Sequence, residues 1–166
     1  MYYVVVFADD EDDYYELFTP NRGSVHDGRY SDNWMITEPD YIIFDVMASN
    51  DAHIGLMADP NSGDDIEYEV AIGSYGNQKV TLRTGIGQGQ VDEVSAPDIL
   101  KEDEFQTFWV SWKDGFIQAG FGGMVGDNFL VEYNDPDAPM VKTISFMTGW
   151  GTTGRWRLKR GMRKYE

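Results

Sequence analysis

An acidic loop in the first half of the chain has the residue types and spacing of a calcium-binding loop. Oxygen-bearing side chains recur at Asp59, Asn61, Asp65 and Glu67, and Gly63 between them allows a sharp turn. Carboxylate and amide oxygens suit calcium, and this alternation resembles the first half of a calcium loop. The twelfth position is a valine, so the loop is not an EF-hand. The segment is interpreted either as a calcium site or as an ordinary acidic hairpin loop.

Two other acidic segments also offer carboxylates to a cation. Asp135 and Asp137 flank a proline in a turn, and the run Asp9–Asp13 lies near the start of the chain. Runs of like charge are usually solvated, which makes the second segment the weaker candidate. Asp135 and Asp137 therefore join the predicted calcium ligands, and calcium is the cofactor that the acidic turns favour.

Aromatic residues in turns are the second kind of candidate ligand-binding residue. Trp150 and Tyr75 have glycine neighbours that let a ring stand exposed, and Trp34 lies ahead of Glu38 and Asp40. An aromatic face stacks on the C–H face of a galactose-type sugar, while carboxylates and amides accept its hydroxyls. The rings of Trp150 and Tyr75 could also simply lock corners of the fold. We predict that Trp150, Tyr75 and Trp34 contact a glycan, and a purely structural role stays an alternative for Trp150 and Tyr75.

The sequence offers little for nucleophilic or phosphate chemistry. His26 lies in a loop, and His53 lies in a predicted strand, where it is interpreted as a hydrogen-bonded structural residue or a ligand contact. No serine motif accompanies either histidine, and zero cysteines exclude a thiol nucleophile and a zinc-thiolate site. Gly85–Gly89 leads into a strand-like segment, so it predicts a strand-connecting loop and not a phosphate site. Carboxylate pairs for glycoside hydrolysis are abundant and therefore unspecific.

Composition and charge narrow the class of partner. The chain has 166 residues, is 42% hydrophobic and carries a net charge of −16. This charge disfavours nucleic acid and anionic membranes. No apolar run approaches the roughly 20 residues that cross a bilayer, so no membrane insertion is expected. The opening residues indicate a strand and not a signal peptide; a secreted or extracellular location is favoured, with the compartment unknown.

Short segments of alternating apolar and polar residues, separated by glycines, must position these candidate ligand-binding residues. Period-two alternation and turn residues predict strands at Tyr2–Phe7, Tyr41–Ala48, Ala52–Met57, Gln106–Trp112, Phe116–Phe121, Phe129–Tyr133 and Lys142–Met147, and around Val70, Val80 and Trp156. Asp114-Gly115 predicts a hairpin turn, and Ala96–Glu104 predicts the one helical turn. About ten short strands without crossover helices pair antiparallel and close into two sheets. We expect an all-β, antiparallel, jelly-roll-like β-sandwich, a single domain over residues 1–166, with Trp109, Trp112 and Trp156 in the core or on a sheet face.

Three stretches resemble one family in their order and spacing. They are 51–56 with 68–83, then 104–115, then 146–156. Together they resemble the farnesoic acid O-methyltransferase-like domain, although Tyr75 stands where the family has tryptophan. The resemblance implies a β-sandwich recognition module, because S-adenosylmethionine enzymes of the common class need a strand, a glycine turn and a helix. Some animal lectins are similar in size, acidity and all-β pattern.

The leading hypothesis is a non-enzymatic lectin that binds a galactose-type glycan and uses calcium. Its predicted ligand-binding residues are Trp150, Tyr75, Trp34, Asn77 and His53. Because single lectin contacts are weak, a homodimer or higher oligomer is expected. One alternative is a protein-interaction or structural β-domain without a small ligand. The other is an enzyme, either a farnesoic acid O-methyltransferase or a glycosidase.

Overall fold

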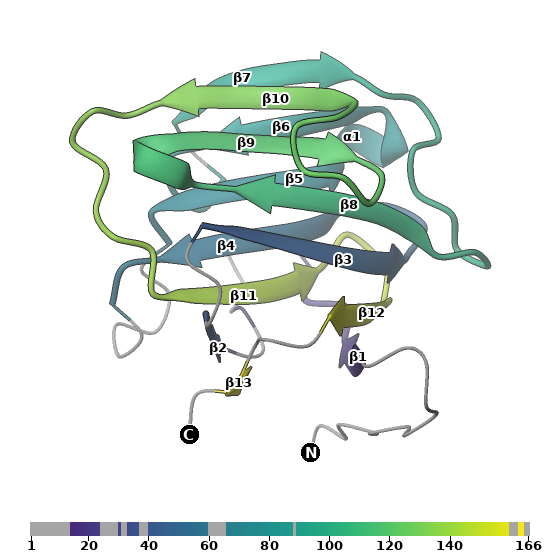
Figure 1. The fold of residues 1–166 in the computed structure, drawn as a ribbon. Coiled ribbons are helices and arrows are strands. Elements are labelled where there is room, and N and C mark those ends of the chain that lie inside the picture. Colours follow the sequence, from purple (N-terminus) through teal and green to yellow (C-terminus); the bar gives the residue numbers. More distant parts are fainter. Residues whose placement is uncertain are drawn as a thin grey trace.

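Two antiparallel sheets face each other in the computed structural model (Figure 1). It describes residues 14–23, 30, 33–36, 40–59, 66–87, 89–159 and 163–164. One sheet has the strand order β1-β12-β3-β8-β9-β10. Its strands are β1 (Tyr14–Thr19), β3 (Tyr41–Met47), β8 (Gln106–Ser111), β9 (Phe116–Phe121), β10 (Phe129–Asn134) and β12 (Gly154–Lys159). We call this the six-stranded sheet.

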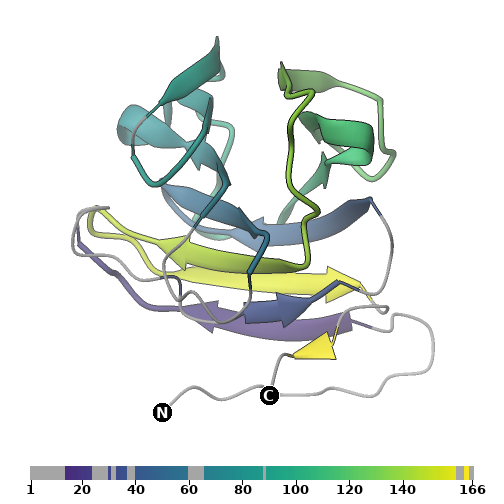
Figure 2. The same ribbon diagram turned by 90° about the vertical axis from the view of Figure 1, so that its left-hand side faces the viewer.

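The seven-stranded sheet has the order β13-β2-β11-β4-β5-β6-β7. Its strands are β2 (Asn33–Met35), β4 (Ala52–Met57), β5 (Tyr68–Gly73), β6 (Lys79–Arg83), β7 (Gln90–Ser95), β11 (Thr143–Thr148) and β13 (Arg163–Lys164). Figure 2 shows β5 to β7 in teal on one side of the sandwich and β8 to β10 in green on the other. The predicted all-β, antiparallel, jelly-roll-like β-sandwich is confirmed.

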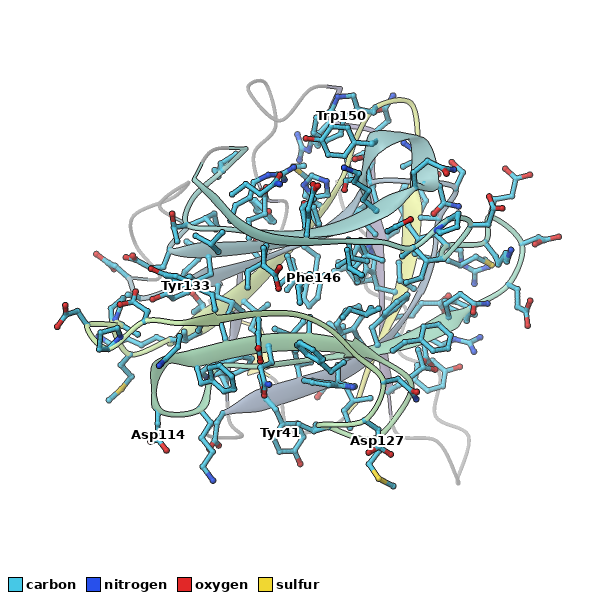
Figure 3. All side chains as sticks on the ribbon, turned by 90° about the horizontal axis from the view of Figure 1, so that it is seen from above. Tyr41, Asp114, Asp127, Tyr133, Phe146 and Trp150 are labelled. Atoms are coloured by element: carbon cyan, nitrogen blue, oxygen red, sulfur yellow. The ribbon has the colours of Figure 1, made fainter. Side chains whose placement is uncertain are left out.

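Alternation along the strands builds the core between the sheets. In β3, Ile42, Phe44 and Val46 are buried while the residues between them are partly or fully exposed. The Phe44 ring lies 5.7 Å from Trp156 and 6.2 Å from Phe146, measured between ring centroids. Such large side chains supply most of the apolar area that a sandwich buries. Figure 3 shows Phe146 between the two sheets.

Local chemistry explains the turn between β8 and β9. Asp114 and Gly115 both have positive φ, 52° and 76°. A side chain on Gly115 would place a Cβ 2.3 Å from the Asp135 carbonyl oxygen, so only glycine fits there. The predicted Asp-Gly hairpin is confirmed. Trp109, Trp112 and Trp156 are buried, as predicted.

The predicted helical turn at Ala96–Glu104 is wrong. Asp98 has a left-handed φ of 56°, and this segment hydrogen-bonds to the β5–β6 turn instead of to itself. The Ala96 and Asp98 amides donate to the carbonyls of Gln78 and Asn77. A tertiary contact thus outweighs the local helix signal of this segment.

Alternation around Val70 is typical of a strand with one face in solvent, but Glu69 is fully buried, and every residue of β4, β5 and β11 is buried. The outer face of the seven-stranded sheet carries a second apolar cluster of Tyr30, Met57, Ile66 and Met147. The predicted strand Tyr2–Phe7 lies outside the described residues, whereas β1 and β2 were not predicted. In the described part of the chain, no helix is long and apolar enough to cross a membrane.

Candidate functional site

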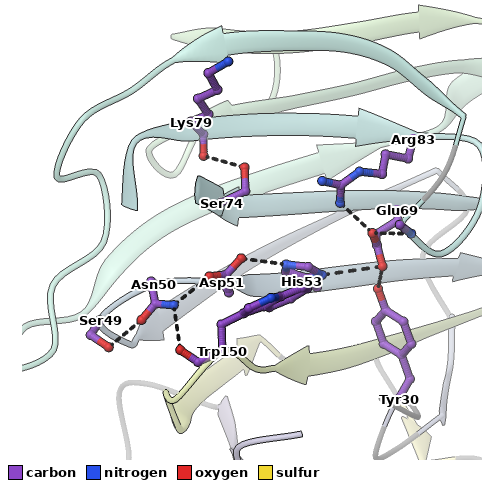
Figure 4. Close-up of polar contacts among 11 residues, drawn as sticks. Tyr30, Ser49, Asn50, Asp51, His53, Glu69, Ser74, Lys79, Arg83 and Trp150 are labelled. Carbon is purple, nitrogen blue, oxygen red and sulfur yellow. Dashed lines mark hydrogen bonds and ion pairs between the residues drawn. The ribbon is translucent and has the colours of Figure 1, made fainter. Parts of the chain in front are cut away.

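Charged side chains gather on the outer face of the seven-stranded sheet, which is the face away from the main core. Strand register places His53 of β4 opposite Ala71 of β5, and Glu69 of β5 opposite Arg83 of β6. Residues two apart on a strand share a face, so His53, Glu69 and Arg83 all lie on the outer surface of the sheet. Figure 4 shows these side chains directed toward one another.

Glu69 is the centre of this network. Its Oε2 accepts a hydrogen bond from the Tyr30 hydroxyl at 2.6 Å, and its Oε1 accepts from Arg83 Nη1 at 2.8 Å. The backbone N–H of Gly87 also donates to Oε1, at 3.3 Å. One buried carboxylate therefore ties together β5, β6, the β6–β7 loop and Tyr30. Such a charge is stable in the interior only because each oxygen is paired.

His53 lies between two carboxylates. Its Nε2 is 3.4 Å from Asp51 Oδ1, and its Nδ1 is 3.5 Å from Glu69 Oε2. Within the described residues Nδ1 forms no hydrogen bond, and the Glu69 carboxylate is its ionic neighbour. When His53 is protonated, its charge and that of Arg83 balance the charges of Asp51 and Glu69. The cluster is therefore neutral in the imidazolium form.

The pKa values follow from these contacts. Burial lowers the pKa of His53, but the interactions with the carboxylates of Asp51 and Glu69 outweigh burial and leave this pKa raised above 6.5. Burial raises the pKa of Glu69, but His53, Tyr30 and Arg83 outweigh burial and hold this pKa at about 2. Burial and Glu69 together raise the pKa of Tyr30 well above 10. The site thus favours an ionised Glu69 beside a protonated His53.

Trp150 covers this network at the end of the sheet. Its ring centroid lies 5.3 Å from that of His53 with the planes 37° apart, yet its side chain is 45% exposed. Its backbone is in the left-handed region (φ 51°), which is rare for a bulky residue. The Trp150 N–H donates to the Gly23 carbonyl at 2.7 Å, and Asn50 Nδ2 lies 3.4 Å from the Trp150 carbonyl. Hydrogen bonds thus hold a strained backbone that presents one face of the indole to solvent.

Tyr75 is presented in the same way in the turn between β5 and β6. It lies in α1 (Ser74–Asn77), where Tyr75, Gly76 and Asn77 all have positive φ. Its ring is 63% exposed, and Lys79 Nζ lies 5.2 Å from the ring centroid. Since Thr148 pairs with Ala52 and Ala52 with Ile72, this turn and the turn of Trp150 lie at the same end of the sheet. The structure thus brings the predicted Trp150, Tyr75 and His53 to one end.

The other predicted ligand residues are placed differently. Both side-chain atoms of Asn77 bond to the backbone of Leu100, so a structural role accounts for this amide. It fastens the 96–105 segment to the sandwich. The backbone of Trp34 lies in β2, opposite Ile144 of β11, and its side chain is outside the described residues.

The predicted calcium ligands do not form a cluster in the described part of the chain, where no three His, Asp or Glu side chains could jointly hold a metal ion. Asp135 accepts from the Tyr68 hydroxyl at 2.5 Å and from the Asp137 N–H at 3.0 Å. Asp137 itself is exposed. Asp59 and Glu67 bracket residues 60–65, so Asn61 and Asp65 lie outside the described residues.

Sequence analysis missed Glu69, Arg83, Tyr30 and Asp51 as site residues. Glu69 alternates with apolar residues in β5 and therefore resembles a solvent-facing position. The available signal was an opposite charge on the neighbouring strand, since Glu69 and Arg83 are equally distant from the turn between them. Cross-strand pairs of this kind are common on exposed sheets too, so the signal does not reveal burial.

The chain is similar to one known protein family. A family model described as farnesoic acid O-methyl transferase matches residues 14–162. No curated protein sequence matches the chain.

Solved structures similar to this chain include several lectins. The galectin LEC-6 of Caenorhabditis elegans is 15% identical over 91% of this chain and 96% of its own, with a TM-score of 0.50. A tetrameric galectin of the ball sponge Cinachyrella sp. is 16% identical over 80% of this chain and 98% of its own, with a TM-score of 0.52. The exoplasmic/lumenal domain of VIP36, bound to Ca2+ and Man3GlcNAc, is 10% identical over 100% of this chain and 84% of its own, with a TM-score of 0.54. At these identities the likeness shows a shared fold.

Proposed function

We propose that this chain, which belongs to the farnesoic acid O-methyl transferase family, is a carbohydrate-binding module that binds its ligand on the exposed face of Trp150. The observation that carries the proposal is the half-exposed indole, fixed by its backbone and by the buried His53 beneath it. The lectins among the similar structures support a sugar as the ligand.

Rigidity is what makes this ring suitable for a weakly bound ligand. A flexible side chain loses conformational entropy when it binds, whereas a fixed ring does not. Trp150 is held by the Gly23 carbonyl, by Asn50 and by the His53 ring, so its orientation is set before a ligand arrives. An aromatic face offers stacking to the C–H groups of a sugar ring, which is the apolar part of an otherwise polar molecule.

Polar groups beside Trp150 supply partners for hydroxyl groups. Asn21 is exposed, and its Oδ1 accepts from the Gly151 N–H at 3.1 Å and the Gly23 N–H at 3.0 Å, while its amide NH2 forms no hydrogen bond within the described residues. Asn50 is half-buried, and its amide is already bonded to Ser49, Asp51 and the Trp150 carbonyl. At the same end of the sheet, the exposed Tyr75 ring lies beside Lys79, which pairs with Glu93. A neutral sugar stacked on Trp150 would therefore find the Asn21 amide beside the ring, with Tyr75 and the Lys79–Glu93 pair at the same end of the sheet.

Binding without catalysis is part of the proposal. His53 and Glu69 form a histidine–carboxylate pair suited to proton transfer, but both are fully buried, with Trp150 packed on the histidine ring. Methyl transfer of the common class needs a glycine turn between a strand and a helix. Among the described residues the one α-helix is the four-residue α1, with left-handed backbone inside it. Calorimetry with S-adenosylmethionine tests this point, and measurable binding would contradict it.

Galactose preference, calcium dependence and self-association are the finer parts of the proposal. Galectins are similar in fold, one of them tetrameric, and the VIP36 structure contains calcium. A calcium ion would take ligands from the acidic segment around Asp59 and Glu67, together with residues 60–65 outside the described ranges. Two or more copies would multiply weak single-site affinities through avidity, and secretion would bring the module to glycans at cell surfaces.

A glycan array tests the proposal directly. The wild-type chain is expected to bind neutral glycans, and Trp150→Ala is expected to lose at least about tenfold in affinity because truncating a central aromatic costs more than about 1.4 kcal/mol. Phe129→Ala is the matched control, since that ring is 47% exposed on β10, away from the site. A chelator arm separates calcium-dependent from calcium-independent binding. Equal binding by wild type and Trp150→Ala would rule out this ring as the platform.

A further inference from the structure

The outer face of the six-stranded sheet carries a groove of about 740 Å³ on the side of the molecule opposite Trp150. Figure 3 shows Tyr41 and Asp114 on that face and Trp150 on the other. A volume of this size lies within the range of about 300 to 1,000 Å³ that small-ligand sites occupy. The groove is separate from the site already described, because the two sheets and their shared core lie between them.

The groove has a polar floor between apolar walls. Strand register puts Tyr41, Ser111 and Gln118 side by side on β3, β8 and β9, and all three line the groove. Tyr41 is 41% exposed and Phe116 is 37% exposed, so two aromatic rings flank the hydroxyl and amide of the floor. Met124 and Val125, from the loop after β9, form the remaining apolar wall.

The polar groups of the groove have spare hydrogen-bonding capacity. Within the described part of the chain, the side chains of Tyr41, Ser111, Asp40 and Lys113 form no hydrogen bond or ion pair. Gln118 uses only its NH2 group, which donates to Glu132 at 3.3 Å. An apolar anchor pressed onto this floor would leave the hydroxyl and the amide without water or partners, which costs free energy. A ligand with hydroxyl edges and C–H faces satisfies both the floor and the walls.

We propose that this groove is a second carbohydrate site, which makes one chain bivalent; the ligand class rests on the function proposed for the Trp150 site. Asp40, Asp114 and Lys113 at one end place carboxylates beside an ammonium. Together with the net charge of −16, this end favours a neutral sugar over an acidic one. A second hollow of about 350 Å³ shares these three residues and extends the path for a longer oligosaccharide.

The indole N–H of Trp109 on β8 can report on the groove through its bond to the neighbouring loop. The Trp109 indole N–H donates to the Asp127 carbonyl at 2.8 Å, so the 122–128 loop, whose residues 123–125 form the groove wall, is bonded to this ring. A ligand in the groove is therefore expected to shift the indole N–H resonance of Trp109. A ligand on the first site is expected to shift the indole resonance of Trp150 instead.

The experiment is a 1H–15N titration of the indole resonances with lactose and with a mannose trisaccharide, assigned by Trp109→Phe and Trp150→Phe variants. With a sugar that binds, both indole signals are expected to shift, each with its own saturation curve. Tyr41→Ala should weaken binding reported by the Trp109 signal at least about tenfold and leave the Trp150 response unchanged. Trp150→Ala removes its own indole signal and should leave the Trp109 response unchanged. Val91→Ala, at a side chain 38% exposed on the edge strand β7 and outside the groove lining, should leave both unchanged.

The outcomes separate the two proposals. A Trp109 signal that stays fixed while Trp150 saturates overturns the second site and leaves the first intact, and the groove is then a surface for a protein partner. A Trp109 shift that survives Tyr41→Ala also overturns it. Saturation at Trp109 alone supports the groove and contradicts the Trp150 platform. Silence at both indoles with both sugars overturns both.

Discussion

Replacing Glu69 by glutamine should destabilise the fold strongly although the two side chains have almost the same shape. Glutamine removes the negative charge that pairs with Arg83 at 2.8 Å and faces His53 at 3.5 Å. Arg83 is largely buried and His53 is fully buried, so both would lose their compensating charge inside the protein. Breaking a buried ion pair by removing one partner costs about 3 to 5 kcal/mol.

The pKa of Glu69 gives a second route to the same magnitude. Folding lowers this pKa from 4.5 to about 2. At about 1.4 kcal/mol per unit, the folded state stabilises the ionised form by roughly 3 kcal/mol. That is a large fraction of the roughly 5 to 15 kcal/mol by which proteins are stable. Urea unfolding of wild type and Glu69→Gln at neutral pH, followed by tryptophan fluorescence, should therefore show a clear drop in midpoint.

Glu93→Gln is the matched control for this experiment. Glu93 also accepts from a cation, Lys79, at 2.9 Å, but both side chains are more than a third exposed. Exposed pairs are screened by water, so Glu93→Gln should shift the urea midpoint little. Equal effects of the two variants would refute the reasoning that burial makes the Glu69 pair important. The difference between wild type and Glu69→Gln should also vanish as the pH falls through about 2, where the native carboxylate becomes protonated.

Three further predictions concern other parts of the structure. Folding raises the pKa of His53, so protonated His53 stabilises the fold fully below the unfolded pKa near 6.5, and this stabilisation is lost as pH rises through the folded pKa. In thermal melts over that pH range, wild type should therefore lose more stability than His53→Gln. Gly120→Ala places a Cβ 2.3 Å from the Trp109 ring, so it should lower the free energy of unfolding by about 1 to 3 kcal/mol, measured by urea unfolding. Asn77→Ala frees the Leu100 backbone, and amide hydrogen exchange in 96–105 should rise while that in β4 stays slow.

Local sequence signals were enough wherever a residue's own conformation decides the structure. Alternating apolar residues gave β4 and β9 with the bounds that the structure has. Asp114-Gly115 was recognisable as a hairpin because these residues reach positive φ at low cost. Trp150 was recognisable as a presented ring from its glycine neighbours, and the structure shows it half-exposed. In each case the physical cause acts within a few residues of chain.

Burial of charged residues and contacts between distant segments could not be predicted from local sequence signals. The alternation around Glu69 is that of an exposed strand, and only the cover formed by Tyr30, the Gly87 loop and the second apolar cluster turns it into an interior charge. The 96–105 segment carries helix signals, yet Asn77, distant in sequence, bonds its backbone to the sandwich.

Sequence alone therefore determined that this chain forms a helix-poor, two-layered sheet structure with presented aromatic turns. Periodicity and turn chemistry are local properties, and they fix the fold class. Only the tertiary structure decided that His53 and Glu69 lie beneath Trp150, and that a groove lies on the opposite face. Those features depend on which strands become neighbours and which loops cover them, and the energy of a charge depends on that cover more than on its neighbours in the chain.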